Sequence, residues 1–314
     1  MVDVAESLSS PAPEPLLVVV AGGSGFLGSH LRSTLRERGH EVVTLVRRAP
    51  TATDESPWDP EAGTLDKTLV RGADVVVNLA GSPTLGNPHS KGWARELRES
   101  RVRTTALLAD TIAQASTPPA FLAGNGISYY GDHGNQMLTE ASDTRGHAFL
   151  TTVTRDWQDA AEPAVEAGAR VCVLRTSPVM DRRAAPLKQL RLQFLAGLGG
   201  RLGNGRQYMP MSSLRDWVGA VTFLAEHPEA SGPVNICLPK APTNAEFTRV
   251  LARDLHRLAV LPAPAPAIRL GAGRMAPELL GSLNVRPAAL LGWGFRFQDA
   301  DVEACLATGL NPRD

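Results

Sequence analysis

From residue 16 onward, short hydrophobic segments alternate with segments that mix hydrophobic and polar residues. Residues 16–21 (LLVVVA) form an apolar, β-branched run between a proline and a glycine, which is typical of a strand buried on both faces. Residues 25–38 carry a leucine at every fourth position with charged residues between, which predicts an amphipathic helix. Residues 41–46 (EVVTLV) predict a second strand. These elements form one βαβ unit.

The alternation of strands and helices continues through the first half of the chain. Further strands are expected at residues 74–79, 120–123 and 170–174, and further helices at residues 91–115 and 147–167. Strands that alternate with helices predict an α/β protein with a doubly wound, parallel, Rossmann-type sheet. In such sheets ligands bind at the carboxyl ends of the strands.

The pattern changes after residue 175. Helices are expected at residues 187–195, 215–226 and 244–258 and near 272–280 and 299–307, with a strand at 233–237 and a Pro/Ala stretch at 261–267. We therefore expect a Rossmann domain over residues 16–180, which residues 206–238 rejoin. A smaller C-terminal substrate domain is expected from residues 181–205 and 239–314.

The N-terminal residues 1–15 are acidic and rich in serine and proline. They lack the basic and apolar regions of a signal peptide, and we expect a disordered tail. No apolar stretch approaches the roughly 20 residues that span a bilayer. These features predict a cytoplasmic protein without a membrane partner.

Composition and charge narrow the range of partners. Hydrophobic residues make up 43% of the 314 residues, and Lys+Arg and Asp+Glu both number 32. A balanced charge produces no global field that would attract nucleic acid or an anionic membrane. Cys172, Cys237 and Cys305 lie far apart and the seven histidines show no ligand spacing, so core thiols and no metal site are expected.

A glycine-rich loop lies between the first predicted strand and the first predicted helix. It consists of Gly22, Gly23, Ser24, Gly25, Phe26, Leu27 and Gly28. Glycine lets the chain turn tightly and lets its backbone approach a pyrophosphate, which the helix N-terminus then attracts. The loop predicts a dinucleotide site, although a tight turn without a ligand is the alternative.

The end of the second predicted strand bears on the choice of dinucleotide. A carboxylate about 20 residues beyond the glycine loop holds the ribose 2′-hydroxyl of NAD. Arg47 and Arg48 occupy this position instead. A pair of guanidinium groups suits a 2′-phosphate, so NADP(H) is favoured over NAD(H), the alternative being two solvated surface arginines.

Several motifs together resemble a known superfamily. Besides the glycine loop they are Asn78-Leu79-Ala80-Gly81, Ser100-Arg101-Val102, Trp58-Asp59-Pro60, Tyr129-Tyr130-Gly131, Trp157, Arg175-Thr176 and the segments 197–207, 232–235 and 244–251. From residue 16 to about residue 305 the chain resembles the extended and atypical short-chain dehydrogenase/reductases, in particular the nucleoside-diphosphate-sugar epimerase-like subgroup. The resemblance implies a Rossmann domain, a small substrate domain and a cofactor that also contacts Leu79, Ala80 and Gly81.

The same resemblance implies where catalytic residues belong. Typical members use a tyrosine and, four residues later, a lysine that lowers the tyrosine pKa. None of the three tyrosines here has a lysine at that spacing, and Leu150 and Thr154 occupy the corresponding positions. Redox or epimerase chemistry by the usual route is therefore in doubt.

The remaining catalytic candidates follow a predicted strand. They are Asn125, which replaces the usual serine, with Ser128, Tyr129 and Tyr130. A tyrosine could donate a proton, but structural packing of both tyrosines is the favoured interpretation. His133 in the same loop is expected at the surface.

A few further residues are candidates for ligand contacts. Thr176, Ser177 and Pro178 follow a strand and are expected to contact the nicotinamide through backbone groups. Arg101, Arg201 and Arg206 are candidates for substrate binding. For Arg101 the alternative is a salt bridge on the helix surface, and for the other two a plain flexible loop.

These features predict an NADP(H)-dependent oxidoreductase or epimerase-like enzyme that acts on a small polar or carbonyl substrate. An NADP(H)-binding regulator or sensor without hydride chemistry is one alternative, and a non-redox isomerase or cyclase that reuses the cleft is another. The missing Tyr/Lys pair favours the alternatives, whereas the glycine loop favours cofactor binding. Analogy with related folds leaves open a homodimer that pairs through the helices at 91–115 and 147–167.

Overall fold

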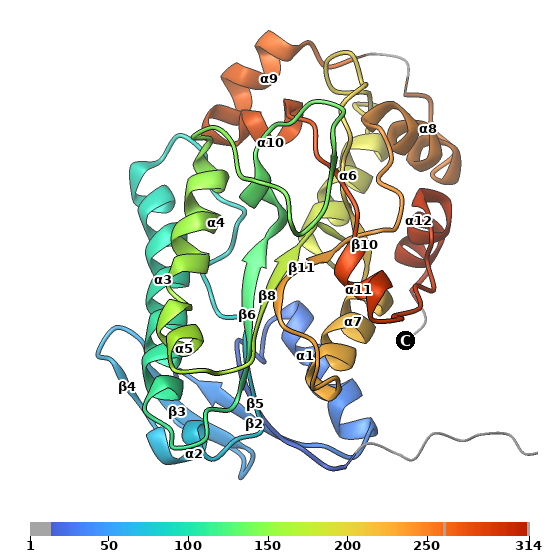
Figure 1. The fold of residues 1–314 in the computed structure, drawn as a ribbon. Coiled ribbons are helices and arrows are strands. Elements are labelled where there is room, and N and C mark those ends of the chain that lie inside the picture. Colours follow the sequence, from blue (N-terminus) through green and yellow to red (C-terminus); the bar gives the residue numbers. More distant parts are fainter. Residues whose placement is uncertain (1–13, 260–261, 313–314) are drawn as a thin grey trace, which may run out of the picture.

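A computed structural model describes residues 14–259 and 262–312 of the chain, and its core is an eight-stranded sheet (Figure 1). The strands are β1 (Leu17–Ala21), β2 (Glu41–Val46), β3 (Glu55–Asp59), β4 (Thr64–Leu65), β5 (Val75–Asn78), β6 (Ala120–Gly126), β8 (Val171–Thr176) and β11 (Gly232–Ile236). Their order across the sheet is β11-β8-β6-β5-β1-β2-β3-β4, and only the β3–β4 pair is antiparallel. The predicted α/β fold of Rossmann type is confirmed.

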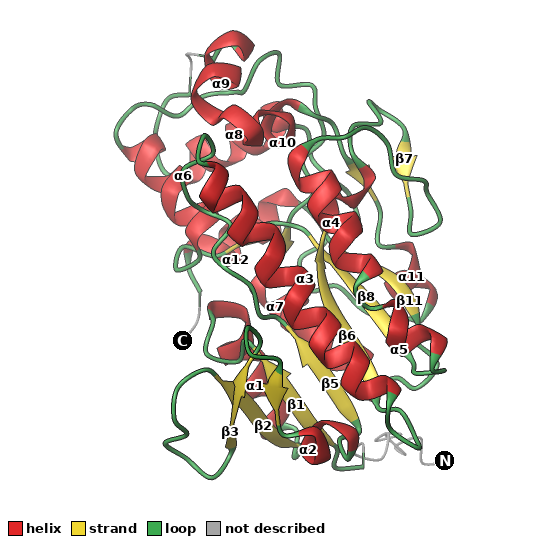
Figure 2. Cartoon of the chain, turned by 90° about the vertical axis from the view of Figure 1, so that its left-hand side faces the viewer, coloured by secondary structure: helices red, strands yellow, loops and turns green. Residues whose placement is uncertain are grey.

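Helices cover both faces of this sheet. On one face lie α3 (Lys91–Ala113), α4 (Phe149–Asp159) and α5 (Glu162–Glu166), which run in front of the strands in Figure 2. On the other face lie α1 (Phe26–Glu37) and α7 (Leu214–Glu226), while the short α2 (Lys67–Arg71) packs beside α3.

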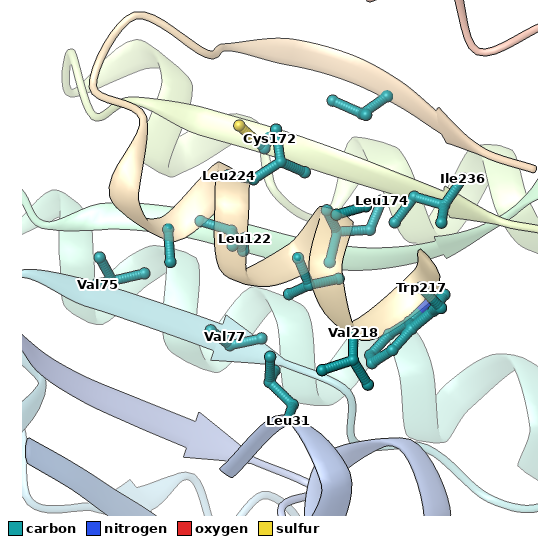
Figure 3. Packing of buried hydrophobic residues seen from close by; sticks show 14 of the residues in the cluster. Leu31, Val75, Val77, Leu122, Cys172, Leu174, Trp217, Val218, Leu224 and Ile236 are labelled. Carbon is teal, nitrogen blue, oxygen red and sulfur yellow. The ribbon is translucent and has the colours of Figure 1, made fainter. Parts of the chain in front are cut away.

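The central strand β1 is apolar at every position because both of its faces are covered. Val18 and Val20 of β1 join the same core cluster as Leu31 of α1, whereas Val19 joins the cluster on the α3 face. Figure 3 shows the first of these clusters, in which Trp217 of α7 is completely buried. Period-two alternation of side chains therefore explains the continuous apolar runs.

The C-terminal part packs against the carboxyl ends of the strands. It contains α6 (Ala185–Leu195), α8 (Asn244–Asp254), α9 (Ala265–Ala272), α10 (Ala276–Leu280), α11 (Ala288–Gly292) and α12 (Val302–Leu310). Two short strand pairs, β9 (Val179–Met180) with β10 (Ser212–Ser213) and β7 (Met137–Leu138) with β12 (Asn284–Val285), tie distant segments together. Two short 3₁₀ helices are η1 (Ile127–Tyr130) and η2 (Gly273–Met275). A separate apolar cluster that includes Phe194, Phe247 and Leu306 forms the core of this part.

Several predicted elements differ from the structure. The single helix expected at 147–167 is wrong, because the first helix ends at Asp159 and a second one begins at Glu162, with Pro163 in its first turn. The helix expected at 244–258 ends at Asp254, shortly before His256, whose φ of 53° is left-handed. The Pro/Ala stretch becomes α9 from Ala265 onward. Strands β3 and β4 and helix α2 were not predicted.

Some expectations concern the ends of the chain and its division. Residues 1–13 of the expected disordered tail lie outside the described residues. Strand β11 lies beside β8 in the main sheet, but the proposed boundaries between two domains stay a prediction. In the described part of the chain no helix is long and apolar enough to cross a membrane. All three cysteines are buried and free.

Candidate functional site

The glycine loop is packed so closely that side chains do not fit at two of its positions. Gly22 has a φ of +78°, and a Cβ on it would lie 2.6 Å from the carbonyl carbon of Leu79. A Cβ on Gly28 would lie 2.3 Å from the Gly22 carbonyl oxygen, which already accepts the Gly25 N–H at 3.0 Å. Glycine here therefore lets the first turn of α1 and the end of β5 approach the loop.

The N-terminus of α1 opens beside this loop. Gly25 is its N-cap and supplies no side-chain cap, and the first turn contains no acidic residue. Ser24 and Gly25 are exposed, and Phe26 and Leu27 are half-buried. Amide groups left without a cap at the start of a 12-residue helix fit an anionic group such as a diphosphate.

The two arginines after β2 have different surroundings. Glu55 on β3 binds Arg48 through Nη1 at 2.8 Å and Nη2 at 2.5 Å. Mainly because of this arginine, the pKa of Glu55 falls to about 2, and the pKa of Arg48 is raised. Arg47 is exposed, and the described residues offer its side chain no hydrogen bond or ion pair. The structure therefore leaves Arg47 available and engages Arg48.

A further arginine lies behind the glycine loop. A Cβ on Gly23 would lie 2.8 Å from both Arg32 Cδ and Thr44 Cγ2, so α1 and β2 meet at this glycine. Arg32 Nε and Thr44 Oγ1 are buried, and neither has a hydrogen-bond partner among the described residues. Unsatisfied buried polar atoms are rare in folded proteins and often mark a missing ligand or water. Thr44 lies on β2, three residues before Arg47.

The segment after β5 completes the edge of the loop. The Leu79 N–H donates to the Ala21 carbonyl at 2.9 Å, and the Ala80 N–H donates to Asn78 Oδ1 at 3.0 Å. A Cβ on Gly81 would lie 3.1 Å from Arg101 Cγ, so glycine makes room for this arginine.

Arg101 lies inward from the surface of α3. Its Nη1 donates to the Ser82 carbonyl at 3.0 Å, its Nη2 donates to Thr84 Oγ1 at 3.1 Å, and its guanidinium lies 5.1 Å from the Trp157 ring centroid. Burial lowers the pKa of Arg101 to about 10. The expected alternative of a surface salt bridge does not describe this arrangement, and a role in substrate binding stays a prediction.

Three of the four catalytic candidates are engaged in internal contacts. The Asn125 amide donates to the Thr154 carbonyl at 3.0 Å and accepts the Gly126 N–H at 2.7 Å. Tyr130 is fully buried, donates to Asn235 Oδ1 at 2.7 Å and accepts from Arg175 Nη1 at 2.8 Å. Burial raises the pKa of Tyr130 to about 12.

Tyr129 and His133 also contribute to packing. The Arg175 guanidinium lies 3.6 Å from the centroid of the half-buried Tyr129 ring. These contacts favour the packing interpretation for both tyrosines. His133 was expected at the surface, which is wrong, because it is 8% exposed and its Nε2 lies 3.1 Å from the Tyr130 carbonyl oxygen.

The fourth candidate, Ser128, lines a cavity of about 550 Å³ between η1, the 145–151 segment and helices α9 and α10. Ser128 Oγ donates to Glu278 Oε2 at 2.6 Å, and burial raises the pKa of this carboxyl. Asp132, Arg145 and Arg269 also line the cavity. Sequence reasoning missed Glu278, Asp132 and Arg269, because nothing in their local patterns places them near Ser128.

The remaining candidates lie at the carboxyl end of β8 and in the segment 201–206. Thr176 Oγ1 accepts from Trp217 Nε1 at 3.1 Å, Ser177 Oγ donates to the Ile236 carbonyl at 2.7 Å, and the Pro178 carbonyl accepts the Ser212 N–H at 3.1 Å. Contact of this segment with a nicotinamide stays a prediction. Arg201 and Arg206 are exposed and do not line the cavity.

Two models of known protein families match this chain. Residues 18–237 match the NAD dependent epimerase/dehydratase family, and residues 263–308 match a domain of unknown function named DUF1731. The chain belongs to the NAD dependent epimerase/dehydratase family. This result confirms the resemblance to epimerase-like short-chain dehydrogenase/reductases that the motifs indicated.

Individual relatives cover nearly the whole chain. An epimerase family protein of Mycobacterium bovis is 38% identical over 282 residues, which are 90% of this chain and 93% of that protein. Human epimerase family protein SDR39U1 is 33% identical over 294 residues, which are 92% of this chain and 98% of that protein.

Two solved structures share both the fold and sequence similarity. The crystal structure of human SDR39U1 (isoform 2) with NADPH superimposes with a TM-score of 0.84 at 30% identity, over 95% of this chain and all (100%) of that chain. A nucleoside-diphosphate sugar epimerase from Corynebacterium glutamicum gives a TM-score of 0.77 at 32% identity, over 94% of this chain and 58% of that one. This family member therefore shares its overall architecture with a chain that was crystallised with NADPH.

Proposed function

We propose that this epimerase-family protein binds NADP(H) at the glycine loop and is an oxidoreductase or epimerase-like enzyme for a small polar or carbonyl substrate. The observation that carries the proposal is the closely packed loop beside an uncapped helix N-terminus. Human SDR39U1, which was crystallised with NADPH, supports the same cofactor. When bound, the nicotinamide supplies hydride exchange.

The basic groups near the end of β2 support NADP(H) over NAD(H). Arg47 is exposed at this position, and Arg32 Nε and Thr44 Oγ1, whose side chains meet at Gly23, are buried without partners among the described residues. A 2′-phosphate offers several acceptor oxygens to guanidinium groups. We assign Arg47 and Arg32 to this phosphate. Arg48 contributes less, because Glu55 already binds its guanidinium in two places.

The cavity beside η1 is the proposed substrate site. Its volume of about 550 Å³ suits a small molecule, and its lining combines Ser128, Glu278 and two arginines with apolar groups. It lies at the carboxyl end of β6, where the fold places ligands.

A calorimetric titration of the intact chain with NADPH and with NADH tests the cofactor assignment. We expect NADPH to bind at least about tenfold more tightly, since charge-assisted hydrogen bonds to one phosphate contribute roughly 1.5–3 kcal/mol. Arg47→Glu is expected to reverse the preference, whereas Arg253→Glu on the distant α8 leaves it unchanged. Folded protein that gives no heat with either nucleotide contradicts the proposal.

A second function is supported by the absence of the usual catalytic pair. Leu150 and Thr154 occupy the positions of the tyrosine and lysine, and the Thr154 hydroxyl donates to the Leu150 carbonyl at 2.9 Å. An NADP(H)-binding regulator without hydride chemistry would need no such pair. Tight NADPH binding without oxidation of NADPH by any of a series of small carbonyl compounds would favour this function.

Assembly as a homodimer is a further proposal. Helices α3 and α4, which analogy suggests as the pairing surface, pack side by side on one face of the sheet (Figure 2). Sedimentation velocity of the purified chain distinguishes a dimer from a monomer.

A further inference from the structure

The proton in the proposed reaction has no carrier at the usual place. Thr154 donates its hydroxyl hydrogen to helix carbonyl groups, and Leu150 carries no polar group. Tyr130 is fully buried between Asn235 and Arg175 and does not line the cavity. A group that exchanges a proton with a carbonyl or hydroxyl oxygen must therefore come from another element that borders the cavity.

Two carboxyl groups line the cavity, and their environments differ. Asp132 is exposed, and its Oδ1 accepts backbone N–H groups from Gly134 at 2.9 Å and Ser282 at 3.3 Å. Glu278 is half-buried on α10, and the polar partner of its carboxyl is the Ser128 hydroxyl. Asp132 thus holds two loop segments together, whereas Glu278 faces a hydroxyl that also borders the cavity.

We propose that Ser128 and Glu278 form the acid–base pair of the cavity, a role that rests on the proposed oxidoreductase function. In the direction of alcohol oxidation, the carbinol carbon gives its hydride to NADP⁺, the two-electron oxidant, and the substrate hydroxyl gives its proton to Ser128 Oγ. The hydrogen of Ser128 Oγ passes to Glu278 Oε2, along the hydrogen bond of 2.6 Å in the structure. The net result is that one proton moves from the substrate hydroxyl to the Glu278 carboxylate. Ser128 Oγ loses one hydrogen and gains another, so it ends as a hydroxyl again. In carbonyl reduction the same proton returns.

The surroundings of Glu278 suit this role. Burial raises the pKa of the carboxyl, and the Ser128 donor opposes this shift only in part. The other charged groups on the cavity wall are Asp132, Arg145 and Arg269, and Arg145 donates to Asp143 at 3.0 Å. A carboxyl whose pKa lies closer to neutral exchanges protons more readily in both directions at cellular pH.

The pair joins two segments that lie far apart in the sequence. Ser128 lies in η1 at the end of a central strand, and Glu278 lies 150 residues later in a five-residue helix. The substrate class that this arrangement fits is a small secondary alcohol or the corresponding carbonyl compound.

Infrared titration of the ligand-free protein tests the pair without turnover. We expect Glu278→Gln to remove a protonated-carboxyl band that persists above the ordinary glutamate range. Glu166→Gln, at an exposed position on α5, should remove only intensity that titrates in the ordinary range. Ser128→Ala should raise the midpoint of the Glu278 band, because the carboxylate loses its donor. The proposal is overturned if the Glu278 carboxyl band titrates in the ordinary glutamate range, or if Ser128→Ala leaves the midpoint of this band unchanged.

Reduction of butane-2,3-dione by NADPH supplies the second readout, because this compound has no group that ionises near neutral pH. The wild-type rate should fall as pH rises through the Glu278 midpoint, since the protonated carboxyl is the donor. Glu278→Gln should lower the rate by roughly 100-fold or more and make it independent of pH. A Glu278→Gln rate equal to wild type, or no wild-type turnover, overturns the acid–base role. Calorimetric NADPH binding, expected to change less than about twofold in Glu278→Gln, shows separately whether the cofactor assignment survives.

Discussion

Tyr130 and Arg175 share a buried hydrogen bond of 2.8 Å, and the same arginine stacks on the ring of Tyr129. The tyrosine that the sequence offers as a proton donor is thus part of the core that joins β8 to η1. Asn235 of β11 accepts the Tyr130 hydroxyl on the other side. The Tyr130 hydroxyl is therefore held in the core, and Tyr130 does not line the cavity that we propose as the substrate site.

Tyr130→Phe should therefore affect stability far more than ligand binding. Removal of the hydroxyl leaves Asn235 Oδ1 without its donor and leaves Arg175 Nη1 with only the Glu140 carbonyl at 3.5 Å, at a cost of about 1–3 kcal/mol. Urea unfolding measures this loss, and NADPH titration should show an unchanged affinity. A variant as stable as wild type but unable to turn over a carbonyl substrate would instead assign a catalytic role to Tyr130.

Gly28→Ala should abolish dinucleotide binding or unfold the loop. The new Cβ would lie 2.3 Å from the Gly22 carbonyl oxygen, which is backbone and cannot move without opening the turn. Gly92→Ala is the matched control, because its nearest contact in helix α3 is 3.7 Å away. The control, in the first turn of α3, should be at least as stable as the wild type and should bind NADPH equally well. Calorimetry with NADPH and thermal unfolding compare the two variants.

Arg32→Met should weaken binding of 2′,5′-ADP while leaving 5′-AMP nearly unchanged. The difference between these probes isolates the 2′-phosphate, and loss of one charge-assisted contact corresponds to about tenfold in affinity or more. Arg36→Met, one turn further along α1, serves as the control, since Arg36 is engaged by Asp54 and by the Val42 carbonyl. Equal loss for both probes would place Arg32 elsewhere than at this phosphate.

The Arg48–Glu55 pair should make stability depend on acid pH. The pKa of Glu55 falls from an ordinary 4.5 to about 2 in the folded chain, chiefly through the hydrogen bond from Arg48. A lowered carboxyl pKa contributes stability that is complete above about pH 4.5 and is lost as pH falls through about 2. Glu55→Gln should therefore be less stable than wild type at neutral pH and equal to it near pH 2. Denaturant unfolding over this range measures the convergence, and parallel curves would contradict the shift.

The features that the sequence predicts well are those that its local pattern encodes. Strand β1 is predictable because its residues form a buried apolar run. The glycine loop is predictable because nearby backbone leaves no room for a side chain at Gly22 or Gly28. Strand β3 lacked this signal, since its sequence is ESPWD and its two buried residues are the polar Ser56 and the apolar Trp58.

The sequence predicted the cofactor half of the candidate site and, of the polar groups in the cavity, Ser128 alone. Arg47 follows β2 at a fixed distance from the loop, so spacing alone identifies it. The partnership of Ser128 with Glu278 depends on tertiary packing across 150 residues, which no periodicity records. Glu55, which engages Arg48, likewise comes from a strand that the pattern did not indicate.

The position of Glu278 has a consequence for how such a protein can diversify. The glycine loop lies near the N-terminal end of the sequence, just before α1. Glu278 lies near the C-terminal end, on α10 and within the DUF1731 segment. With Glu278 in its proposed role, exchange of that late segment between relatives would alter the accepted molecule while the early turn stays unchanged. A single recombination event between the two regions would then combine an unchanged cofactor-binding loop with a different substrate specificity.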